Sequence, residues 1–346
     1  MRIAVLGAGI IGRMHIDTVV RSPGATLTAL VDPAPDSARL AATLNVAHFP
    51  ALEPMLDAGI ADAAIIAAPN AAHLPLGRAC LEAGLPVLME KPLAATLAEG
   101  RMLADVVSRT GVPLLVGHHR RHHPIIRAAK AAIERGAIGD LVTATVMSIL
   151  SKPPSYFQGW RIEKGQGGPL LINASHEVDL LRHFFGEITE VSAMTSHARR
   201  GHPVEETAAF VARFASGGIA TLTQSDAACG PWAWDVTSGE SRGRFPANDA
   251  IAHIYAGTRA GLSLPDLTLW QHPGAPDWAD AMERVRLPHG TDDGPEDVYE
   301  AQLAHFIAVA QSAVPPLISA EDGLRTMAVL DAIVQAADSG ATVAVG

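Results

Sequence analysis

The sequence has little cysteine, little positive charge and no long apolar run. Its 346 residues include only two cysteines, Cys80 and Cys229, and neither belongs to a C-x-x-C pair. We therefore expect a reducing, cytoplasmic environment without a disulfide framework, and both thiols buried as small hydrophobic groups.

The charge balance excludes several classes of partner. The formal net charge is −10, and lysines and arginines form no extended run. Nucleic acids and anionic membrane surfaces are therefore not expected as partners, whereas a small substrate is. No apolar stretch approaches the roughly 18 residues of a membrane span. Met1-Arg2 leads directly into a short apolar run, so we expect no signal peptide.

The composition instead predicts two well-packed domains. Hydrophobic residues make up 48% of the chain and charged residues 18%, which supports a large core. Short apolar runs alternate with helical segments in the first third, which is typical of a doubly wound parallel sheet. We predict these strands at 2–6, 25–31, 63–68, 86–89 and 113–117.

After about residue 123 the pattern changes, because strand-like segments follow one another through turns. This predicts an α+β domain with an open, mainly antiparallel sheet. The expected strands are 141–150, 188–197, 207–214, 218–226, 232–237, 251–257 and 266–270, and 273–296 is expected to be a surface loop. Helices are expected at 124–134, before 185, at 297–311 and at 321–338.

A glycine-rich turn follows the first predicted strand and opens a helix. Gly7-x-Gly9-x-x-Gly12, with Ile10 and Ile11 inside it, matches the turn that binds a dinucleotide diphosphate at a helix N-terminus. Asp32 ends the second strand, where a carboxylate accepts hydrogen bonds from the ribose hydroxyls and repels a 2′-phosphate. The sequence therefore predicts NAD rather than NADP as the cofactor.

Two further segments end strands at the same edge of the predicted sheet. Pro69, Asn70 and His73 follow the third strand and are candidates for cofactor contacts, although Asn70 as a helix N-cap is an equal alternative. Glu90-Lys91 follows the fourth strand, and both residues are further candidates for cofactor contacts. An ammonium there would hold a reacting oxygen, but by itself Lys91 resembles an ordinary surface lysine.

Five strings follow one another along nearly the whole chain: APNAAH at 68–73, AGLPVLMEKPLA at 83–94, GHHRRHHP at 117–124, GGPLLINASHEVD at 167–179 and EDGL at 321–324. In this order they resemble the glucose–fructose oxidoreductase/inositol dehydrogenase (Gfo/Idh/MocA) family. The resemblance implies a Rossmann domain, a catalytic Lys91, a cis Lys91–Pro92 bond and a last helix that packs on the first domain. It also implies a homodimer or homotetramer formed through the second domain's sheet.

The resemblance further implies that His176 is the proton-transfer residue, a role that suits an imidazole. Many family members carry an aspartate four residues earlier, where this chain has Ile172. Asn173 precedes His176 by three residues and would share its helix face, so it is a candidate substrate ligand. Asp179 could orient the imidazole or lie on the helix surface.

Other substrate contacts are expected from residues near these strings. Arg120 follows the fifth strand, and Trp160-Arg161 precedes the glycine-rich stretch. Arg161 would pair with a substrate carboxylate, with a surface arginine as the alternative. Four histidines, His118, His119, His122 and His123, lack a completing carboxylate or cysteine, so we expect no metal site.

Together these features predict an NAD-dependent dehydrogenase acting on a secondary alcohol of a sugar, sugar acid or cyclitol. The domains are expected at 1–122, joined by helix 321–339, and at 123–320. A cis-dihydrodiol dehydrogenase, with an apolar cleft around Ile172 and Trp160, is one alternative. A non-catalytic NAD-binding sensor is another.

Overall fold

The computed structural model describes residues 1–165, 167–240, 245–289 and 297–346. They form two compact units, of which the first contains Met1–His119 and Val298–Met327, and the second Arg120–Asp297 and Ala328–Gly346. The expected second domain included helix α9 (Val298–Ala310), which here packs with the first unit. The reason is that Leu303 and Phe306 of α9 are buried in the first unit's core.

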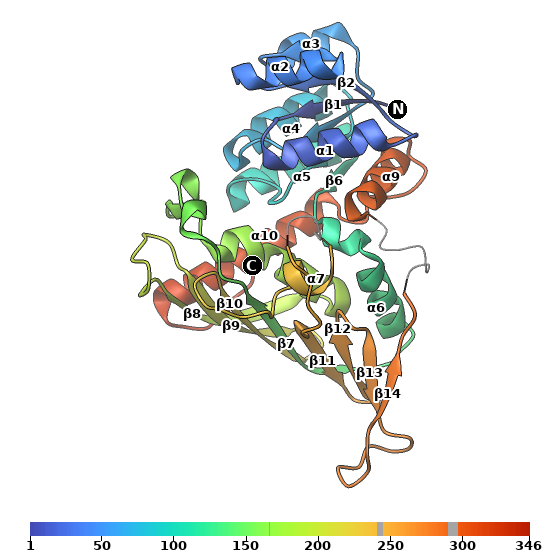
Figure 1. Cartoon of the computed structure of the whole chain (residues 1–346), viewed down its shortest axis with the longest axis vertical. Coiled ribbons are helices and arrows are strands. Elements are labelled where there is room, and N and C mark those ends of the chain that lie inside the picture. Colours follow the sequence, from blue (N-terminus) through green and yellow to red (C-terminus); the bar gives the residue numbers. More distant parts are fainter. Residues whose placement is uncertain (166, 241–244, 290–296) are drawn as a thin grey trace. The chain divides into compact units, whose positions relative to one another are not determined.

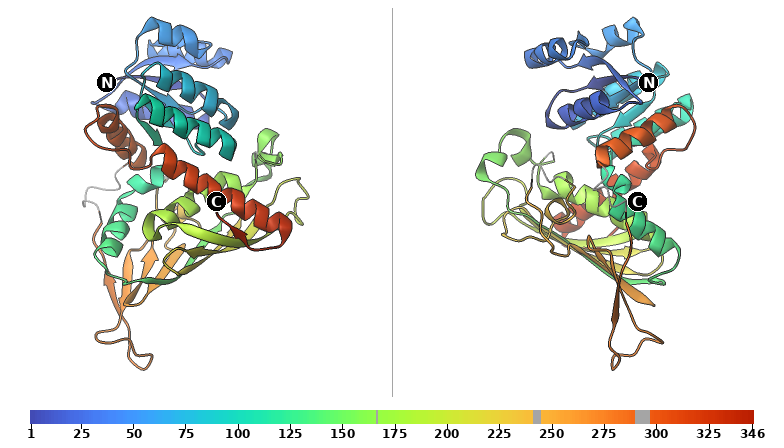
Figure 2. Two further views of the ribbon diagram at one scale, coloured as in Figure 1. Left: turned by 180° about the vertical axis from the view of Figure 1, so that it is seen from behind. Right: turned by 45° about the vertical axis from the view of Figure 1, so that its right-hand side comes forward.

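The first unit is built on a parallel sheet of six strands in the order β3-β2-β1-β4-β5-β6. Helices α4 and α5 cover one face and α1 and α9 the other (Figures 1 and 2). The strands are β1 (Arg2–Leu6), β2 (Thr26–Val31), β3 (Ala47–Phe49), β4 (Ala63–Ile66), β5 (Val87–Met89) and β6 (Leu114–Val116). The helices before α9 are α1 (Ile10–Arg21), α2 (Pro35–Leu44), α3 (Leu52–Ala58), α4 (His73–Glu82) and α5 (Leu97–Thr110).

This sheet confirms the predicted doubly wound fold. The strand order reverses direction at β1, which pairs with both β2 and β4. Ligands of such sheets bind at the carboxyl ends of the strands beside this point. Strand β3 and helix α3 were not predicted, because β3 has only three residues and none of them is fully buried.

The second unit has a mixed sheet of nine strands, in the order β14-β13-β12-β11-β7-β10-β9-β8-β15. Only β7 and β10 pair in parallel; the other pairs are antiparallel. The strands are β7 (Leu141–Ile149), β8 (Ile188–Ser196), β9 (Thr207–Phe214), β10 (Ile219–Ser225), β11 (His253–Gly257), β12 (Ala260–Leu264), β13 (Thr268–Gln271), β14 (Glu283–Arg286) and β15 (Val343–Ala344).

Three helices supply the apolar side chains that fill the core over one face of this sheet. They are α6 (Pro124–Glu134), α7 (Ser175–Phe185) and the later part of α10 (Ala320–Ser339). Ile126, Leu181 and Ile333, one from each helix, are fully buried in the same core. Helix α7 carries His176 and is therefore the element that positions the second candidate catalytic residue.

Some expectations for the second unit were wrong. Residues 232–237 do not form a strand, because Trp234–Thr237 is the short helix α8 with the Trp234 ring fully buried. The expected loop 273–296 contains strand β14, while 290–296 lie outside the described residues. Cys80 is buried as expected, but Cys229 is exposed. Among the described residues, no helix is long and apolar enough to cross a membrane.

A buried ion pair fixes helix α7 within the second unit. The Arg121 guanidinium donates from Nε to Asp179 Oδ2 at 2.9 Å and from Nη2 to Oδ1 at 2.7 Å. The two side chains are 5% and 1% exposed. Because neither charge can be solvated, each depends on the other.

We expect Asp179→Ala to destabilise the protein by about 3–5 kcal/mol, since it leaves the Arg121 charge buried without its partner. Urea unfolding followed by circular dichroism would measure this loss. Glu190→Ala is the matched control, because the Glu190–Arg213 pair lies at the surface and its loss should cost less than about 1 kcal/mol. Equal losses in the two variants would contradict the assignment.

Candidate functional site

Of the three glycines in the turn between β1 and α1, only Gly9 leaves open space for a ligand. A Cβ atom on Gly7, whose φ is +96°, would lie 2.5 Å from Ala67 O, and one on Gly12 would lie 2.0 Å from Gly7 O. Gly9 has no atom within 4 Å of its Cβ position and is the N-cap of α1 without a side-chain cap. The helix N-terminus is therefore open to an anion, as a diphosphate site requires.

The apolar residues of the turn complete this site. Ile10 is 64% exposed, whereas Ile11 is half-buried beside it. An exposed isoleucine at the first helical position offers an apolar surface next to the anion site. The residues present therefore fit a dinucleotide.

Asp32 is held beside the turn by two backbone groups. Its Oδ2 accepts from the Ala8 N–H at 2.7 Å and its Oδ1 from the Ala34 N–H at 2.7 Å. Each carboxylate oxygen keeps a further lone pair for a ribose hydroxyl. Asp32 thus has the place and the acceptor capacity that the NAD prediction requires.

The segment after β4 differs in detail from the expectation for Asn70. Asn70 opens the short 3₁₀ helix η1 (Asn70–Ala72), and α4 begins after Ala72 without a side-chain cap, so Asn70 is not its N-cap. His73 is buried, with Nδ1 2.8 Å from Pro92 O and Nε2 3.0 Å from Ala68 O. These contacts tie the loops after β4 and β5 together, and burial lowers the pKa of His73.

The loop after β5 presents Lys91 on a constrained backbone. The Lys91–Pro92 peptide bond is cis, as the family resemblance implied. Glu90 is buried; its Oε2 accepts from the Lys91 N–H at 3.2 Å, and its Oε1 lies 2.8 Å from His15 Nε2. Lys91 itself is half-buried.

Glu90 is ionised despite its burial. Burial alone would raise the pKa of this carboxyl, but the hydrogen bond with His15 and the charges of His15, His119 and Lys91 lower its pKa to about 2. The Tyr299 ring stacks on His119 at 4.8 Å between centroids and meets His15 edge-on at 5.6 Å. His15 and Tyr299 were not predicted as part of this site. Neither residue lies in a sequence motif that would indicate its place near Glu90 and Lys91.

The second unit presents His176 at the start of α7. The preceding turn is the π-helical segment η5 (Leu170–Ala174), and such turns are frequent at functional sites. His176 is 6% exposed. Asn173, three residues earlier, accepts a hydrogen bond at Oδ1 from Lys152 Nζ at 2.7 Å. Lys152, which follows β7, was not predicted.

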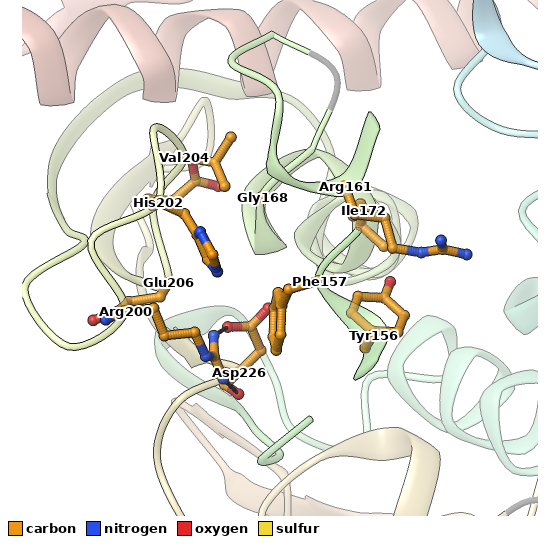
Figure 3. A pocket seen from close by; sticks show the side chains of 11 residues that line it. Tyr156, Phe157, Arg161, Gly168, Ile172, Arg200, His202, Val204, Glu206 and Asp226 are labelled. Atoms are coloured by element: carbon orange, nitrogen blue, oxygen red, sulfur yellow. Dashed lines mark hydrogen bonds and ion pairs between the residues drawn. The ribbon is translucent and has the colours of Figure 1, made fainter. Parts of the chain in front are cut away.

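A pocket within the second unit lies beside η5, with Ile172 on its wall (Figure 3). Arg200 is fixed there by ion pairing with Asp226 and by stacking 3.7 Å from the Phe157 ring centroid. The Arg161 guanidinium stacks on Tyr156 at 4.8 Å. The lining residues are Tyr156, Phe157, Arg161, Gly168, Ile172, Arg200, His202, Val204, Glu205, Glu206 and Asp226.

The remaining expected substrate ligands have different surroundings. Arg120 is 3% exposed, and its guanidinium donates to Glu177 at 2.7 Å and to Asp235 at 3.1 Å. Asp179 is neither on the helix surface nor free for substrate, because Arg121 occupies both its oxygens. These two side chains therefore act as structural supports of α7. Trp160 is 44% exposed, and Arg161 lies 5.0 Å from its ring centroid.

The histidine string is distributed among separate structural roles. His123 Nδ1 accepts from the Ile125 N–H and caps α6, and its ring meets Trp234 edge-on. Within the described ranges, no group of three or more His, Cys, Asp or Glu side chains is arranged to hold a metal ion.

Comparison with known proteins matches both parts of the chain to one family. Residues 1–118 match "Oxidoreductase family, NAD-binding Rossmann fold" and residues 130–345 match "Oxidoreductase family, C-terminal alpha/beta domain" of Gfo/Idh/MocA. The chain belongs to the Gfo/Idh/MocA family. It is thus an NAD-dependent oxidoreductase, and the predicted cofactor is confirmed.

Gfo/Idh/MocA relatives span nearly the whole chain. The 1,5-anhydro-D-fructose reductase of Ensifer adhaerens is 26% identical and covers 98% of this chain and 97% of that protein. The inositol 2-dehydrogenase of Rhizobium meliloti is 26% identical, with coverages of 97% and 96%. The WlbA dehydrogenase of Bordetella pertussis, solved with NADH and UDP-GlcNAcA, shares the fold, with a TM-score of 0.80, 22% identity and coverages of 100% and 99%.

We expect Asp32→Ala to weaken NAD⁺ binding by about tenfold or more, since hydrogen bonds to a carboxylate are each worth roughly 1.5–3 kcal/mol. Binding of NADP⁺ should stay unchanged or improve, because the carboxylate that repels its 2′-phosphate is removed. Calorimetric titration of both dinucleotides would measure the change. Asp36→Ala, at an exposed neighbouring position, should leave both affinities unaltered. An NADP⁺ preference in the unmodified protein would contradict the role of Asp32.

Proposed function

We propose that this oxidoreductase converts a secondary alcohol of a small polyhydroxylated substrate, such as a sugar, sugar acid or cyclitol, into the ketone, and the reverse. The proposal rests on one observation above all: Lys91 and His176 lie in two of the strings that resemble the family, and a buried carboxylate beside each is held by hydrogen bonds. Lys91 lies in the cis-proline loop pinned by Glu90, and His176 on the helix pinned by Arg121. Relatives named for anhydrofructose and inositol support this substrate class.

The chemistry divides between the cofactor and two side chains. A nicotinamide dinucleotide held at Gly9 and Asp32 would supply the hydride acceptor for the carbinol carbon. The Lys91 ammonium donates a hydrogen bond to the reacting oxygen and stabilises the negative charge that develops on it. His176 accepts the hydroxyl proton, so that the alcohol loses one hydride and one proton as the ketone forms. In reduction His176 returns the proton to the same oxygen.

Substrate contacts are proposed for Asn173, Arg161 and Trp160. Asn173 precedes His176 by three residues, and Arg161 stacks between the Tyr156 and Trp160 rings. The cofactor contacts proposed for Pro69 and Asn70 follow from their place after β4 at the carboxyl edge of the sheet.

The two alternative functions find less support. A dihydrodiol dehydrogenase would need an apolar cleft around Ile172, whereas the adjoining pocket combines aromatic and aliphatic side chains with two arginines and three carboxylates. A cofactor-binding sensor would not need both Lys91 and His176, and the full-length relatives include a reductase and a dehydrogenase.

We expect Lys91→Ala and His176→Ala each to lower kcat by about 10²–10⁴-fold, as loss of an electrostatic or acid–base group does. NADH formation would be followed with a panel of sugars, sugar acids and cyclitols. Lys164→Ala is the control, because Lys164 is exposed. Binding of NAD⁺ to all variants should be checked by calorimetry. Full kcat in Lys91→Ala would overturn the assignment.

We also propose that the outer face of the nine-stranded sheet forms a homodimer or homotetramer interface. A row of uncharged side chains crosses this face, because Ile254 pairs with Thr145, Thr145 with Thr221, and Thr221 with Val211. All four residues are exposed. An uncharged, exposed row that spans four strands favours a second copy of the same face.

Val211→Glu should shift the protein toward the monomer, because pairing would then bury two carboxylates against each other. Sedimentation velocity would measure the mass, and circular dichroism would show that the fold is retained. Val314→Glu, at a similarly exposed valine of the first unit, should leave the assembly unchanged. A wild-type monomer would refute the interface.

A further inference from the structure

Lys152 fixes the orientation of the Asn173 amide. Its Nζ donates to Asn173 Oδ1 at 2.7 Å. An ammonium can only donate hydrogen bonds, so the amide must turn its oxygen toward Lys152 and its NH₂ group away. At the position three residues before His176, the chain therefore presents a hydrogen-bond donor.

Lys152 is itself held in place by its surroundings. Its Nζ lies 3.7 Å from Asp226 Oδ2 and 4.5 Å from the Tyr156 ring centroid. Burial lowers the pKa of Lys152, which the carboxylates of Asp226 and Asp235 oppose. Because Asp226 also pairs with Arg200, one carboxylate serves two cations.

The carboxylates of Glu205 and Glu206, which also line the pocket, accept hydrogen bonds from backbone N–H groups. Glu205 Oε1 accepts from the Leu170 N–H at 2.9 Å. Glu206 accepts from the backbone N–H groups of Arg199 and Arg200 at 2.5 and 2.7 Å. Both side chains are therefore already engaged, and Figure 3 shows Glu206 across the pocket from Tyr156.

Arg161 is the cation that lacks such a partner. Its guanidinium stacks on Tyr156 and Trp160, and within the described ranges it forms no ion pair. Its Nε is buried without a hydrogen-bond partner. Lys152 and Arg161 thus both lie within 5 Å of the Tyr156 ring centroid.

We propose that this site selects a substrate carrying a carboxylate, such as a uronic or aldonic acid, rather than a neutral polyol. Arg161 pairs with the carboxylate, Asn173 donates to it from its NH₂ group, and Lys152 is the positioning residue that keeps Asn173 a donor. This inference rests on the proposed function, and it names the substrate class of that same site.

The test uses matched pairs of substrates that differ only in a carboxylate that replaces one hydroxymethyl group: D-glucuronate against D-glucose, D-galacturonate against D-galactose, and D-gluconate against D-glucitol. NADH formation by the NAD⁺-loaded enzyme gives kcat and KM. Calorimetric titration of each acid into the NADH-loaded enzyme gives affinity without turnover. We expect kcat/KM to favour the acid of the best pair by about tenfold or more, and the acid alone to bind measurably.

The variants separate positioning from stability. Lys152→Met should raise KM for the acid about tenfold while kcat and the KM of the neutral partner change little. Asn173→Asp should lower acid affinity further, because a carboxylate replaces the donor. Lys164→Met is the control, since it removes one positive charge at an exposed position. Circular dichroism and NAD⁺ affinity would confirm that each variant is folded.

The outcomes distinguish the two proposals. If neither these pairs nor a panel of cyclitols reduces NAD⁺, the proposed function fails. If substrates are oxidised but acids and neutral partners are used and bound alike, the carboxylate inference fails while the proposed function stands. A Lys152→Met variant that affects acid and neutral substrates equally would overturn the positioning role.

Discussion

Two consecutive buried arginines set the position of the helix that carries His176. Arg121 holds Asp179 in a two-bond pair, and Arg120 holds Glu177, the residue next to His176. Taking such charges out of water costs several kcal/mol per ion unless each meets its partner. The first turn of α7 can therefore occupy only the position that satisfies both pairs. The position of His176, which lies in this turn, is therefore set by the two ion pairs.

The same network extends into the sheet below. His253 Nε2 lies 3.0 Å from Glu177 Oε2, and its Nδ1 lies 2.8 Å from the Tyr255 hydroxyl on the same strand. In the first unit, Glu90 has the corresponding role. It is buried, lies within hydrogen-bond distance of His15 and accepts a hydrogen bond from the backbone N–H of Lys91. In both units a buried carboxylate next to the candidate catalytic residue does the positioning. Reactive geometry thus depends on residues that need not touch a substrate.

These dependences explain which parts were predictable from the sequence. Gly7, Gly12 and Asp32 lie within one continuous segment that runs from β1 through α1 to the end of β2, so their spacing alone describes the cofactor site. Lys91 and His176 could be predicted as catalytic residues only from the resemblance to the family, because a lysine after a strand and a histidine on a helix are common in proteins of any function.

Long-range partners explain the rest. Arg120 was expected in a substrate cleft, but its partner Glu177 is 57 residues away in sequence and nothing near Arg120 signals its burial. Trp234 was assigned to a strand because a short apolar run resembles both a strand and a buried helical turn. Lys152 stands beside two prolines and looks like an ordinary loop residue. Only its contact with Asn173 gives it a role.

At position 172, where the resemblance led us to expect an aspartate, this chain has Ile172. This difference is best considered together with the surroundings of Asn173 and Arg161. Ile172 brings no acceptor to the pocket wall, and Lys152 already donates to the amide oxygen of the neighbouring Asn173. Both features leave donors in excess, and Arg161 adds an unpaired positive charge beside Tyr156. Buried donors without acceptors are costly. A ligand that brings acceptor oxygens and negative charge removes that cost, and a carboxylate brings both.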